Sequence, residues 1–459
     1  MEEEKHEIVI VGAGLAGSLL ALMLAQRGKH VRVFEYRDDP RRAAGGKERA
    51  RSINLALSTR GLTALNKAGL EERLREIGVP MHGRCLHSVA GTTELQRYGQ
   101  QGQYLLSVSR SRLNEVLIDA AAQYGDHVSI SFGQKCETAD LDTGTLEFGA
   151  RSGTKAARTR VQAKHIIGAD GSFSRVRGAM QKKDRFNFQQ SYLPAGYKEL
   201  SIPPGPQGEY QMEPHALHIW PRHKFMLIAL PNLDGSFTCT LFMDFEGPQS
   251  FAALKTEQDV EAFFRAHFKD ALPLMPTLVE DFFANPTPSL VTIRCDPFHH
   301  MDRALLIGDA AHAIVPFFGQ GINAGFEDVR ILTELMDSHE ANAGFDEALF
   351  RSYTAARKEN ADAIADLALS NYDEMASKTA SAWFRVRRRM GLLLNKVAPG
   401  AFMPLYSMIS FSNIPYAESV RRSKMQEERI KSILFASGAL VLGATACLAG
   451  ARHLVTSRR

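Results

Sequence analysis

The hydrophobic positions of the chain predict an α/β fold in which short buried strands alternate with helices. Ile8–Val11 is a β-branched apolar run that is typical of a buried parallel strand. A helical pattern follows over Leu15–Gln26, and Gly28 is suited to end this helix. Val31–Phe34 has the character of the next strand. Two distant runs, Val161–Ile167 and Ala304–Ile307, resemble the first strand in composition. We expect these strands to belong to one sheet.

The middle of the chain has a different pattern. Leu217–Trp220, Phe225–Leu230 and Phe237–Phe242 are strand-like runs that follow one another closely. Turn signals occur at Pro221 and over Pro231–Gly235. Closely spaced strands with short turns favour an antiparallel sheet.

The C-terminal part is helical in pattern from Phe345 to about Met425. Beyond it, Ile433–Ala451 is a stretch of about 19 residues without a charged side chain, with Lys431 before it and Arg452 after it. That length is enough for a helix to cross a bilayer. The alternative is a buried helix of the soluble body. We expect a terminal transmembrane helix that anchors the chain modestly, because the span also contains glycines.

A glycine-rich turn follows the first strand. Gly12 permits the tight turn, Gly14 allows the backbone to approach a phosphate, and Gly17 allows the helix to pack on the strand. The helix that begins at Leu15 and Ala16 directs its positive end at a pyrophosphate. Glu35, at the end of the second strand, is placed to bind ribose hydroxyls. These residues alone leave NAD and FAD both open.

Two later segments favour FAD. Gly168–Gly171, with Asp170, and Gly308–His312, with Asp309, each follow a predicted strand. Either aspartate alone could be a helix N-cap. However, Gly319–Asn323 opens another helix soon after Asp309, and its N–H groups and dipole would stabilise negative charge on a reduced isoalloxazine ring.

With these three segments the chain resembles the single-component flavoprotein aromatic hydroxylases. The resemblance implies that Asp309 holds the ribityl hydroxyls and that Arg110 contacts FAD. Five further stretches, 50–57, 217–221, 236–242, 315–321 and 371–375, resemble the branch that hydroxylates L-kynurenine to 3-hydroxykynurenine. The likeness runs from about Ile8 to Arg422. The residues expected to bind FAD are Gly12, Gly14, Leu15, Ala16, Gly17, Glu35, Arg37, Arg51, Asn54, Ala56, Arg110, Asp170, Asp309, Gly319, Gln320, Gly321, Ile322 and Asn323.

The resemblance also implies a pocket for an aromatic amino acid. Arg84 would hold the carboxylate with its planar fork, and Tyr98 would add a hydroxyl donor. Without the resemblance both residues read as surface side chains. Phe318 stands where bacterial members often have histidine, so no histidine chemistry is expected there. The other expected substrate contacts are Asn371, Glu374, Met375, Tyr406, Phe242, Met226, Ile228, Leu230, Pro316 and Phe317.

The reaction that the family carries out depends on the cofactor. NADPH reduces the flavin, dioxygen adds at its C4a carbon, and the resulting hydroperoxide passes one oxygen atom to the ring. The site must stay dry, because water favours decay to hydrogen peroxide. Since the flavin carries the chemistry, we expect no catalytic side chain. The sequence shows no second dinucleotide-binding loop, so we expect NADPH to dock transiently on the FAD-binding body.

The predicted architecture is therefore discontinuous. We expect a Rossmann-like FAD-binding domain over 1–180 and 293–335, a substrate domain with an antiparallel sheet over 181–292, a helical region over 336–430, and a membrane anchor over 431–459. By likeness to animal members, the membrane would be the mitochondrial outer membrane, with the body in the cytosol. A bacterial source would make it the cytoplasmic membrane. Oligomeric state does not follow from the sequence.

Composition adds several exclusions. The net charge of +4 is small and no nucleic-acid-binding motif is present, so we expect no nucleic-acid partner. The five cysteines have no metal-ligand spacing, so we expect buried thiols and no metal. The acidic N-terminus, Met1–Lys5, resembles neither a secretory signal nor a transit peptide.

Two other functions fit parts of the pattern. One is another membrane-associated flavin monooxygenase that acts on a quinone or sterol precursor, whose long apolar pocket would lack the pair Arg84 and Tyr98. The other is a non-catalytic prenyl-binding protein of related fold. The intact segments at Asp170, Asp309 and Gly319–Asn323 argue against the second.

Overall fold

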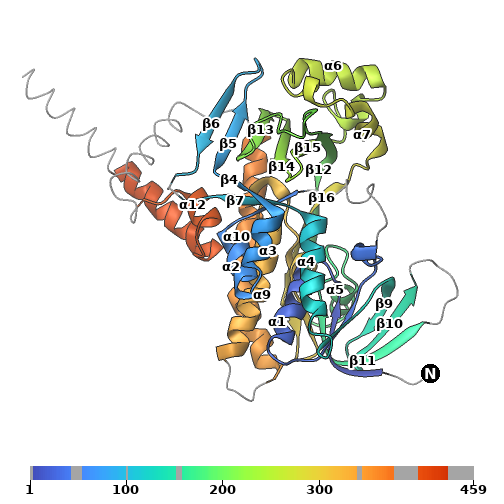
Figure 1. Cartoon of the computed structure of the whole chain (residues 1–459). Helices are drawn as coiled ribbons and strands as arrows, with labels where there is room; N and C mark the ends of the chain where they lie inside the picture. The colour runs from blue at the N-terminus through green and yellow to red at the C-terminus, as the bar shows by residue number, and fades with distance from the viewer. Residues whose placement is uncertain are drawn as a thin grey trace, which may run out of the picture. The chain divides into compact units, whose positions relative to one another are not determined.

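The computed structural model describes residues 4–42, 54–99, 102–150, 158–338, 344–376 and 402–432. It forms two units, Met1–Lys378 and Thr379–Arg459. The first unit contains the predicted strands and both expected sheets. Figure 1 shows the ribbon.

The first sheet has the strand order β17-β18-β11-β1-β2-β8. Strand β1 is parallel to both of its neighbours, because helical crossovers connect the strands. Two further strands, β9 and β10, extend the sheet from β11 in antiparallel fashion. The strands are β1 (Glu4–Val11), β2 (Val31–Phe34), β8 (Val128–Ser131), β9 (Gln134–Asp140), β10 (Thr145–Ala150), β11 (Thr159–Gly168), β17 (His299–His300) and β18 (Ala304–Leu306).

Helix α1 (Leu15–Ala25) is nearly all apolar and is buried on almost every side. It packs against α4 (Arg110–Ala122) and α9 (Gly321–Ser338), and α9 also packs against α2 (Thr59–Lys67) and α10 (Glu347–Ala376). The predicted helix stop is confirmed, because Gly28 follows α1 with φ of 70°. Shorter helices are α3 (Glu71–Ile77), α5 (Arg175–Met180) and α8 (Asp309–His312).

The second sheet has the order β16-β12-β15-β14-β13-β5-β6. The sheet is antiparallel as expected, apart from the parallel pair of β13 and β5. Helices α6 (Glu257–His267) and α7 (Leu278–Ala284) lie beside it (Figure 1). The strands are β5 (Gly83–His87), β6 (Thr93–Arg97), β12 (Asn187–Ile202), β13 (Ala216–Arg222), β14 (Phe225–Pro231), β15 (Phe237–Asp244) and β16 (Ser289–Asp296).

Two details differ from the sequence patterns. The second sheet includes β5 and β6, which lie outside the 181–292 range. Pro221 was expected to mark a turn, and this was wrong: it lies inside β13, and the chain turns at His223, whose φ is 62°. A small third sheet, β3 (Asn54–Leu57), β7 (Leu105–Ser109) and β4 (Gly78–Met81), completes the unit.

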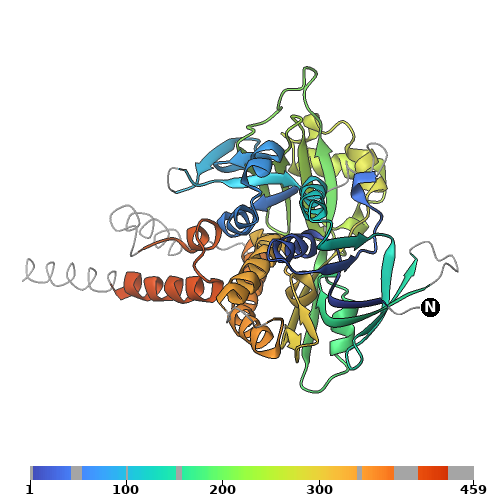
Figure 2. The ribbon, with the colours of Figure 1, turned by 60° about the horizontal axis from the view of Figure 1, so that its bottom comes forward.

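Strands β12 and β16 carry the chain into and out of the second sheet. They pair in antiparallel register, with Phe188 opposite Cys295. Figure 2 shows the two strands side by side. The chain therefore visits the second sheet and returns to the first, where β17 and β18 follow.

The second unit is helical over its described part, with α12 (Leu405–Ser410) and helical residues 416–432. No helix among the residues described here is both long and apolar enough to cross a membrane. The span predicted as an anchor, Ile433–Ala451, lies outside the described residues.

Candidate cofactor and substrate site

Three glycine-containing turns meet at one edge of the first sheet. In the register of β1, β11 and β18, Val11 lies opposite Gly168, and Gly168 lies opposite Leu306. The three strands are parallel, so the segments that follow their carboxyl ends are neighbours. The predicted convergence of the Gly12, Asp170 and Asp309 segments is confirmed. This edge is where open α/β sheets bind ligands.

The glycines of the first turn have separate roles. Gly12 has φ of 105°, which side chains rarely adopt. A Cβ at Gly17 would lie 2.0 Å from the carbonyl oxygen of Gly12, so α1 can approach the turn only without a side chain there. A Cβ at Gly14 would meet nothing within 4 Å. The space beside Gly14 and the start of α1 therefore fits a pyrophosphate.

The two residues after Gly14 face the protein. Leu15 is buried in the core. A Cβ added at Gly308 would lie 3.4 Å from the Cβ of Ala16. The first turn and the turn after β18 therefore lie close together. Contacts of Leu15 and Ala16 with the cofactor stay a prediction.

Glu35 lies at the end of β2 and is buried. Its carboxylate accepts hydrogen bonds from the backbone N–H of Ala13 at 2.7 Å and from that of Arg37 at 2.8 Å. Each carboxylate oxygen can accept a second bond, so capacity remains for ribose hydroxyls. The guanidinium of Arg37 lies 3.8 Å from Glu35 and is largely exposed. The acid therefore links the glycine turn to the position expected for ribose.

Asp170 has a different environment from the one expected of a cofactor ligand. Its Oδ2 accepts a hydrogen bond of 2.6 Å from the backbone N–H of Arg175, at the start of α5. Burial raises the pKa of this carboxyl group. The contact is of the helix-capping kind that the sequence left as an alternative. A cofactor contact by Asp170 stays a prediction.

Asp309 is exposed at the first position of α8, after Gly308 with φ of 57°. The turn is fixed from behind by Asp328 on α9, which is fully buried. Asp328 Oδ2 accepts a hydrogen bond of 2.8 Å from Gly308 N and lies 2.6 Å from His312 Nε2. Its other oxygen accepts a bond of 2.7 Å from Arg357 Nε. Asp309 is thus presented outward by a rigid turn.

The buried charges continue into the neighbouring Glu327. This carboxylate binds Arg60 of α2 at 2.8 Å and Arg357 of α10 at 2.7 Å. Burial alone would raise the pKa of Glu327, but the guanidinium groups of Arg357 and Arg60 outweigh burial and hold it below its ordinary value. This network was not predicted from the sequence. The sequence signal for it is the pair of adjacent acids, Glu327 and Asp328, in a helix that is otherwise largely apolar.

The start of α9 is tied to β3 by Asn323. Its Nδ2 donates to Ala56 O at 3.0 Å, and its Oδ1 accepts from Ser58 N at 2.8 Å. Gln320 is also buried, 3.4 Å from the hydroxyl of Ser58. Both side chains bind the protein itself. The first N–H groups of α9, from Gly321 and Ile322 onward, have no partner within the helix and are the groups suited to bind a flavin.

Asn54 and Arg110 lie at the boundary between the small sheet and the second sheet. Asn54 Nδ2 donates to Asn232 Oδ1 at 2.7 Å and to Pro231 O at 3.2 Å. Arg110 is exposed, and its charge acts on Glu199 of β12, whose pKa is nevertheless raised by burial. Glu199 was not expected at the site.

A cleft of about 560 Å³ opens at this boundary, and Asn54 and Glu199 are part of its lining. The lining also contains the cation of Arg112 and four carboxylates, which belong to Glu199, Asp234, Glu280 and Asp281. Such a surface disfavours a phosphate-bearing ligand. The cleft is distinct from the aromatic wall described next.

One face of the second sheet forms the expected apolar wall. Met226, Ile228 and Leu230 alternate along β14, so they share that face. Phe242 on β15 lies opposite Met226. Phe317 packs on Phe242 with ring centroids 5.3 Å apart. The structure therefore brings these five predicted substrate contacts to one surface.

Arg84 is on this same face. It lies opposite Leu217 of β13, and Leu86, two residues later, lies opposite Ile219, which pairs with Ile228. Tyr98 follows β6, its backbone N–H bonded to His82 O, and it extends the row that holds Gln96 opposite Arg84. A cationic fork and a phenol thus stand at one end of an apolar wall.

The structure gives the positions of some of the remaining predicted contact residues. Asn371 Nδ2 donates to Phe317 O at 3.2 Å, and its neighbour Tyr372 packs on the Phe317 ring with centroids 5.0 Å apart. Pro316 is exposed at the start of the short 3₁₀ turn that ends at Gly319, whose φ is 65°. Outside the described parts are Arg51 and the side chains of Glu374 and Met375, while Tyr406 belongs to the second unit.

Sequence comparisons agree with this geometry. A family model described as an FAD binding domain matches residues 5–368. The chain is 45% identical over 433 residues to a kynurenine 3-monooxygenase of Flavobacterium psychrophilum, covering 94% of each chain. It is 44% identical to that of Dictyostelium discoideum, covering 89% of each chain, and 42% identical to that of Sus scrofa, covering 97% of this chain and 92% of the relative.

Solved structures show the same fold at low identity. A 2-methyl-3-hydroxypyridine-5-carboxylic acid oxygenase aligns with a TM-score of 0.64 at 18% identity, covering 92% of this chain and 98% of the other. A probable FAD-dependent monooxygenase of Pseudomonas aeruginosa aligns at 0.65 and 16%, covering 82% and 97%. With its three converging turns and its full-length relatives, this chain belongs to the kynurenine 3-monooxygenase family of FAD-dependent monooxygenases.

Proposed function

We propose that the chain hydroxylates L-kynurenine to 3-hydroxykynurenine, using FAD, NADPH and dioxygen. The observation that carries this substrate is the position of Arg84, on the same sheet face as the wall of Met226, Ile228 and Phe242. A carboxylate-binding fork beside an apolar wall suits a carboxylate joined to an aromatic ring. A uniformly apolar substrate would offer no carboxylate for the guanidinium to bind.

The residues present fit FAD. Following β2, β1 and β18 along one sheet edge, Glu35, the open space at Gly14 and the exposed Asp309 lie in the order of ribose, pyrophosphate and ribityl chain in FAD. When bound and reduced by NADPH, FAD supplies the activation of dioxygen. Every other task belongs to side chains and backbone groups of the protein.

The substrate side chains position and shield the ring. Arg84 would engage both carboxylate oxygens, a geometry that lysine cannot reproduce. Phe242, Phe317 and Tyr372 form a continuous ring cluster that excludes water from the reacting edge. Asn371 holds the Phe317 backbone and thereby the position of that wall. The ring amino group of kynurenine activates the neighbouring carbon, so the protein needs no general base.

Product identification tests this proposal. Purified, yellow protein is mixed with L-kynurenine, NADPH and air, and the product is analysed by mass spectrometry. We expect a gain of one oxygen atom at ring carbon 3. NADPH oxidation with an apolar quinone precursor, and none with kynurenine, would favour the rival monooxygenase. A folded protein that cannot take up flavin would favour the prenyl-binding alternative.

We also propose that residues 431–459 anchor the chain in a membrane, on the basis of the uncharged stretch Ile433–Ala451 and its basic flanks. In a eukaryote this would be the mitochondrial outer membrane, with the body in the cytosol. A chain that ends at Ser432 should leave the membrane fraction on cell fractionation. Retention of the shortened chain would contradict the proposal.

A further inference from the structure

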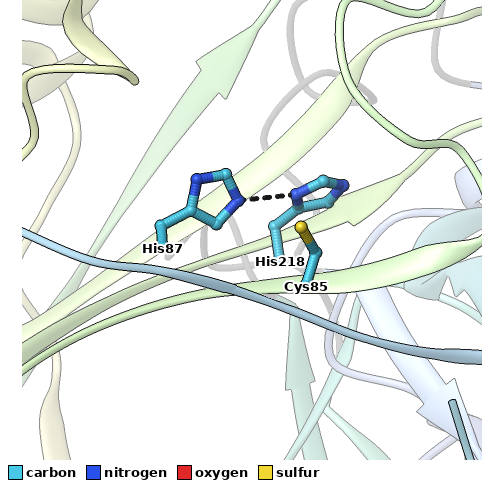
Figure 3. A group of neighbouring side chains, drawn as sticks. All are labelled: Cys85, His87 and His218. Carbon is cyan, nitrogen blue, oxygen red and sulfur yellow. Dashed lines mark hydrogen bonds between the residues drawn. The ribbon is translucent and has the colours of Figure 1, made fainter. Parts of the chain in front are cut away.

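Three metal-binding side chains lie behind Arg84, on the opposite face of the second sheet. Cys85 and His87 are neighbours of Arg84 along β5, and His218 is on the adjoining strand β13. All three are buried, with exposed fractions of 6%, 4% and 1%. Figure 3 shows the sulfur of Cys85 and the two imidazole rings gathered at one point between the strands.

Each histidine has one ring nitrogen held by an outer partner. His87 Nδ1 lies 2.5 Å from the carboxylate of Asp270, and His218 Nε2 donates to the carbonyl oxygen of Glu213 at 2.8 Å. The inner nitrogens, His87 Nε2 and His218 Nδ1, face each other at 2.9 Å. Histidines that bind metals show this same arrangement, in which a carboxylate or a carbonyl orients the ring from outside.

A single proton holds the two rings together. Burial lowers the pKa of His218 to about 4, so at neutral pH its Nδ1 is bare and accepts from His87 Nε2. Burial alone would raise the pKa of Asp270, but hydrogen bonds from His87 and Trp220 outweigh burial and lower it. Asp270 is therefore a carboxylate, and it orients the His87 ring through Nδ1.

The separation of the ligand atoms is close to that of a metal site. The Cys85 sulfur and one nitrogen from each ring all lie within 4.8 Å of one another. In a tetrahedral zinc site, ligand bonds of about 2.0–2.3 Å place sulfur and nitrogen atoms about 3.3–3.8 Å apart. A side-chain movement of about 1 Å closes the gap. One thiolate with two imidazoles is a ligand set that suits zinc.

We propose that Cys85, His87 and His218 bind one zinc ion, with Asp270 orienting His87 and a water molecule completing the tetrahedron. No metal was expected from the sequence, because the five cysteines have no metal-ligand spacing, and more than a hundred residues separate His87 from His218. Only the parallel pairing of β5 with β13 brings them together. The ion fastens these strands directly behind Arg84.

The charges of the zinc-bound site balance. Without the metal the Cys85 thiol is neutral, since burial raises the pKa of that thiol. Zinc binds the thiolate, so the thiol proton is released. The double positive charge of zinc is then matched by the thiolate and by the Asp270 carboxylate, so binding leaves no uncompensated buried charge.

The test uses the full-length, flavin-loaded protein. After treatment with a chelator, the protein is titrated with zinc, and bound zinc and released protons are counted. We expect one zinc ion per chain, bound with release of the thiol proton. Cobalt, used as a spectroscopic probe of the same ligands, should give absorption bands at wavelengths beyond those of the flavin.

Variants identify the ligands. Cys85→Ser and Cys85→Ala should weaken zinc binding at least about tenfold, while Asp270→Asn should weaken it about 10–100-fold through His87. Cys136→Ala removes a buried thiol of the first sheet and should change nothing. Flavin retention reports that each variant is folded. The proposal is overturned if the wild type binds no stoichiometric zinc, or if both Cys85 variants bind zinc as the wild type does.

Discussion

Asp328 accepts a hydrogen bond of 2.8 Å from the backbone N–H of Gly308, so α9 fixes the turn that presents Asp309. The same carboxylate binds His312 and Arg357, and all of these groups are buried. A fully buried carboxylate with three charged or polar partners is strongly constrained. The position of the expected ribityl ligand is thus set by a residue 19 positions later in the sequence.

Asp328→Asn should weaken FAD binding. The amide cannot neutralise Arg357, which then keeps only Glu327 as an acidic partner, and breaking a buried ion pair costs about 3–5 kcal/mol of folding stability. We expect the FAD dissociation constant, measured by flavin fluorescence, to rise at least about tenfold. Asp337→Asn is the matched control, because Asp337 lies on the same helix but in an exposed pair with Arg27. Equal FAD affinity in the two variants would show that Asp328 does not position the turn.

Stability should fall in acid. The pKa values of Glu327 and Asp328 are lowered, because their guanidinium and imidazole partners outweigh the effect of burial. A carboxyl group with a lowered folded-state pKa stabilises the fold above its unfolded pKa, and this stability is lost as pH falls through the folded value. The melting temperature should therefore stay constant near neutral pH. It should decline as the pH falls below the ordinary pKa values of glutamate and aspartate, 4.5 and 3.8. This decline of the melting temperature with falling pH should be shallower in Asp328→Asn. An equally steep decline in the variant would show that other groups cause the loss of stability in acid.

Gly17→Ala should prevent the chain from forming a stable fold that binds FAD. The added Cβ would lie 2.0 Å from a backbone oxygen of Gly12, and backbone cannot move aside cheaply. Gly178→Ala in α5 is the control, since its Cβ would meet nothing within 4 Å. Alanine in a helix interior is favoured over glycine by up to about 1 kcal/mol, so this variant should melt no earlier than the wild type. Similar flavin content in both variants would contradict the packing role of Gly17.

Arg84→Ala should raise the KM for L-kynurenine and leave kcat and FAD content nearly unchanged. Loss of hydrogen bonds to a charged group costs about 1.5–3 kcal/mol, which corresponds to a rise of about 10–150-fold in KM. Arg97→Ala is the control, because Arg97 lies opposite Gly83 on β6 and is exposed. Steady-state kinetics distinguish the two variants. A normal KM in Arg84→Ala would remove Arg84 from the substrate site.

The parts of the fold that follow from local rules could be predicted. The strand before Gly12, the helix stop at Gly28 and the alternation of Met226 and Ile228 depend on neighbours in the sequence, and all three are found. The convergence of the three turns also followed, because parallel strands place their carboxyl ends together.

The parts that depend on distant contacts could not be predicted. Nothing in the run Gly83–His87 indicates that it pairs with the distant β13 as well as with its neighbour β6. Asn323 has the position of a flavin ligand in the sequence, but its amide is bound to Ala56 and Ser58. The partners of Asp328 come from three separate helices and turns.

The order of elements along the chain has a consequence for biosynthesis. Helix α1 is among the first segments to leave the ribosome, yet one of the helices that cover it is α9, at Gly321–Ser338. Part of the apolar surface of α1 therefore stays uncovered while some 300 further residues are translated. A nascent chain of this kind is a natural client for chaperones, and fragments that end before α9 should aggregate when expressed alone.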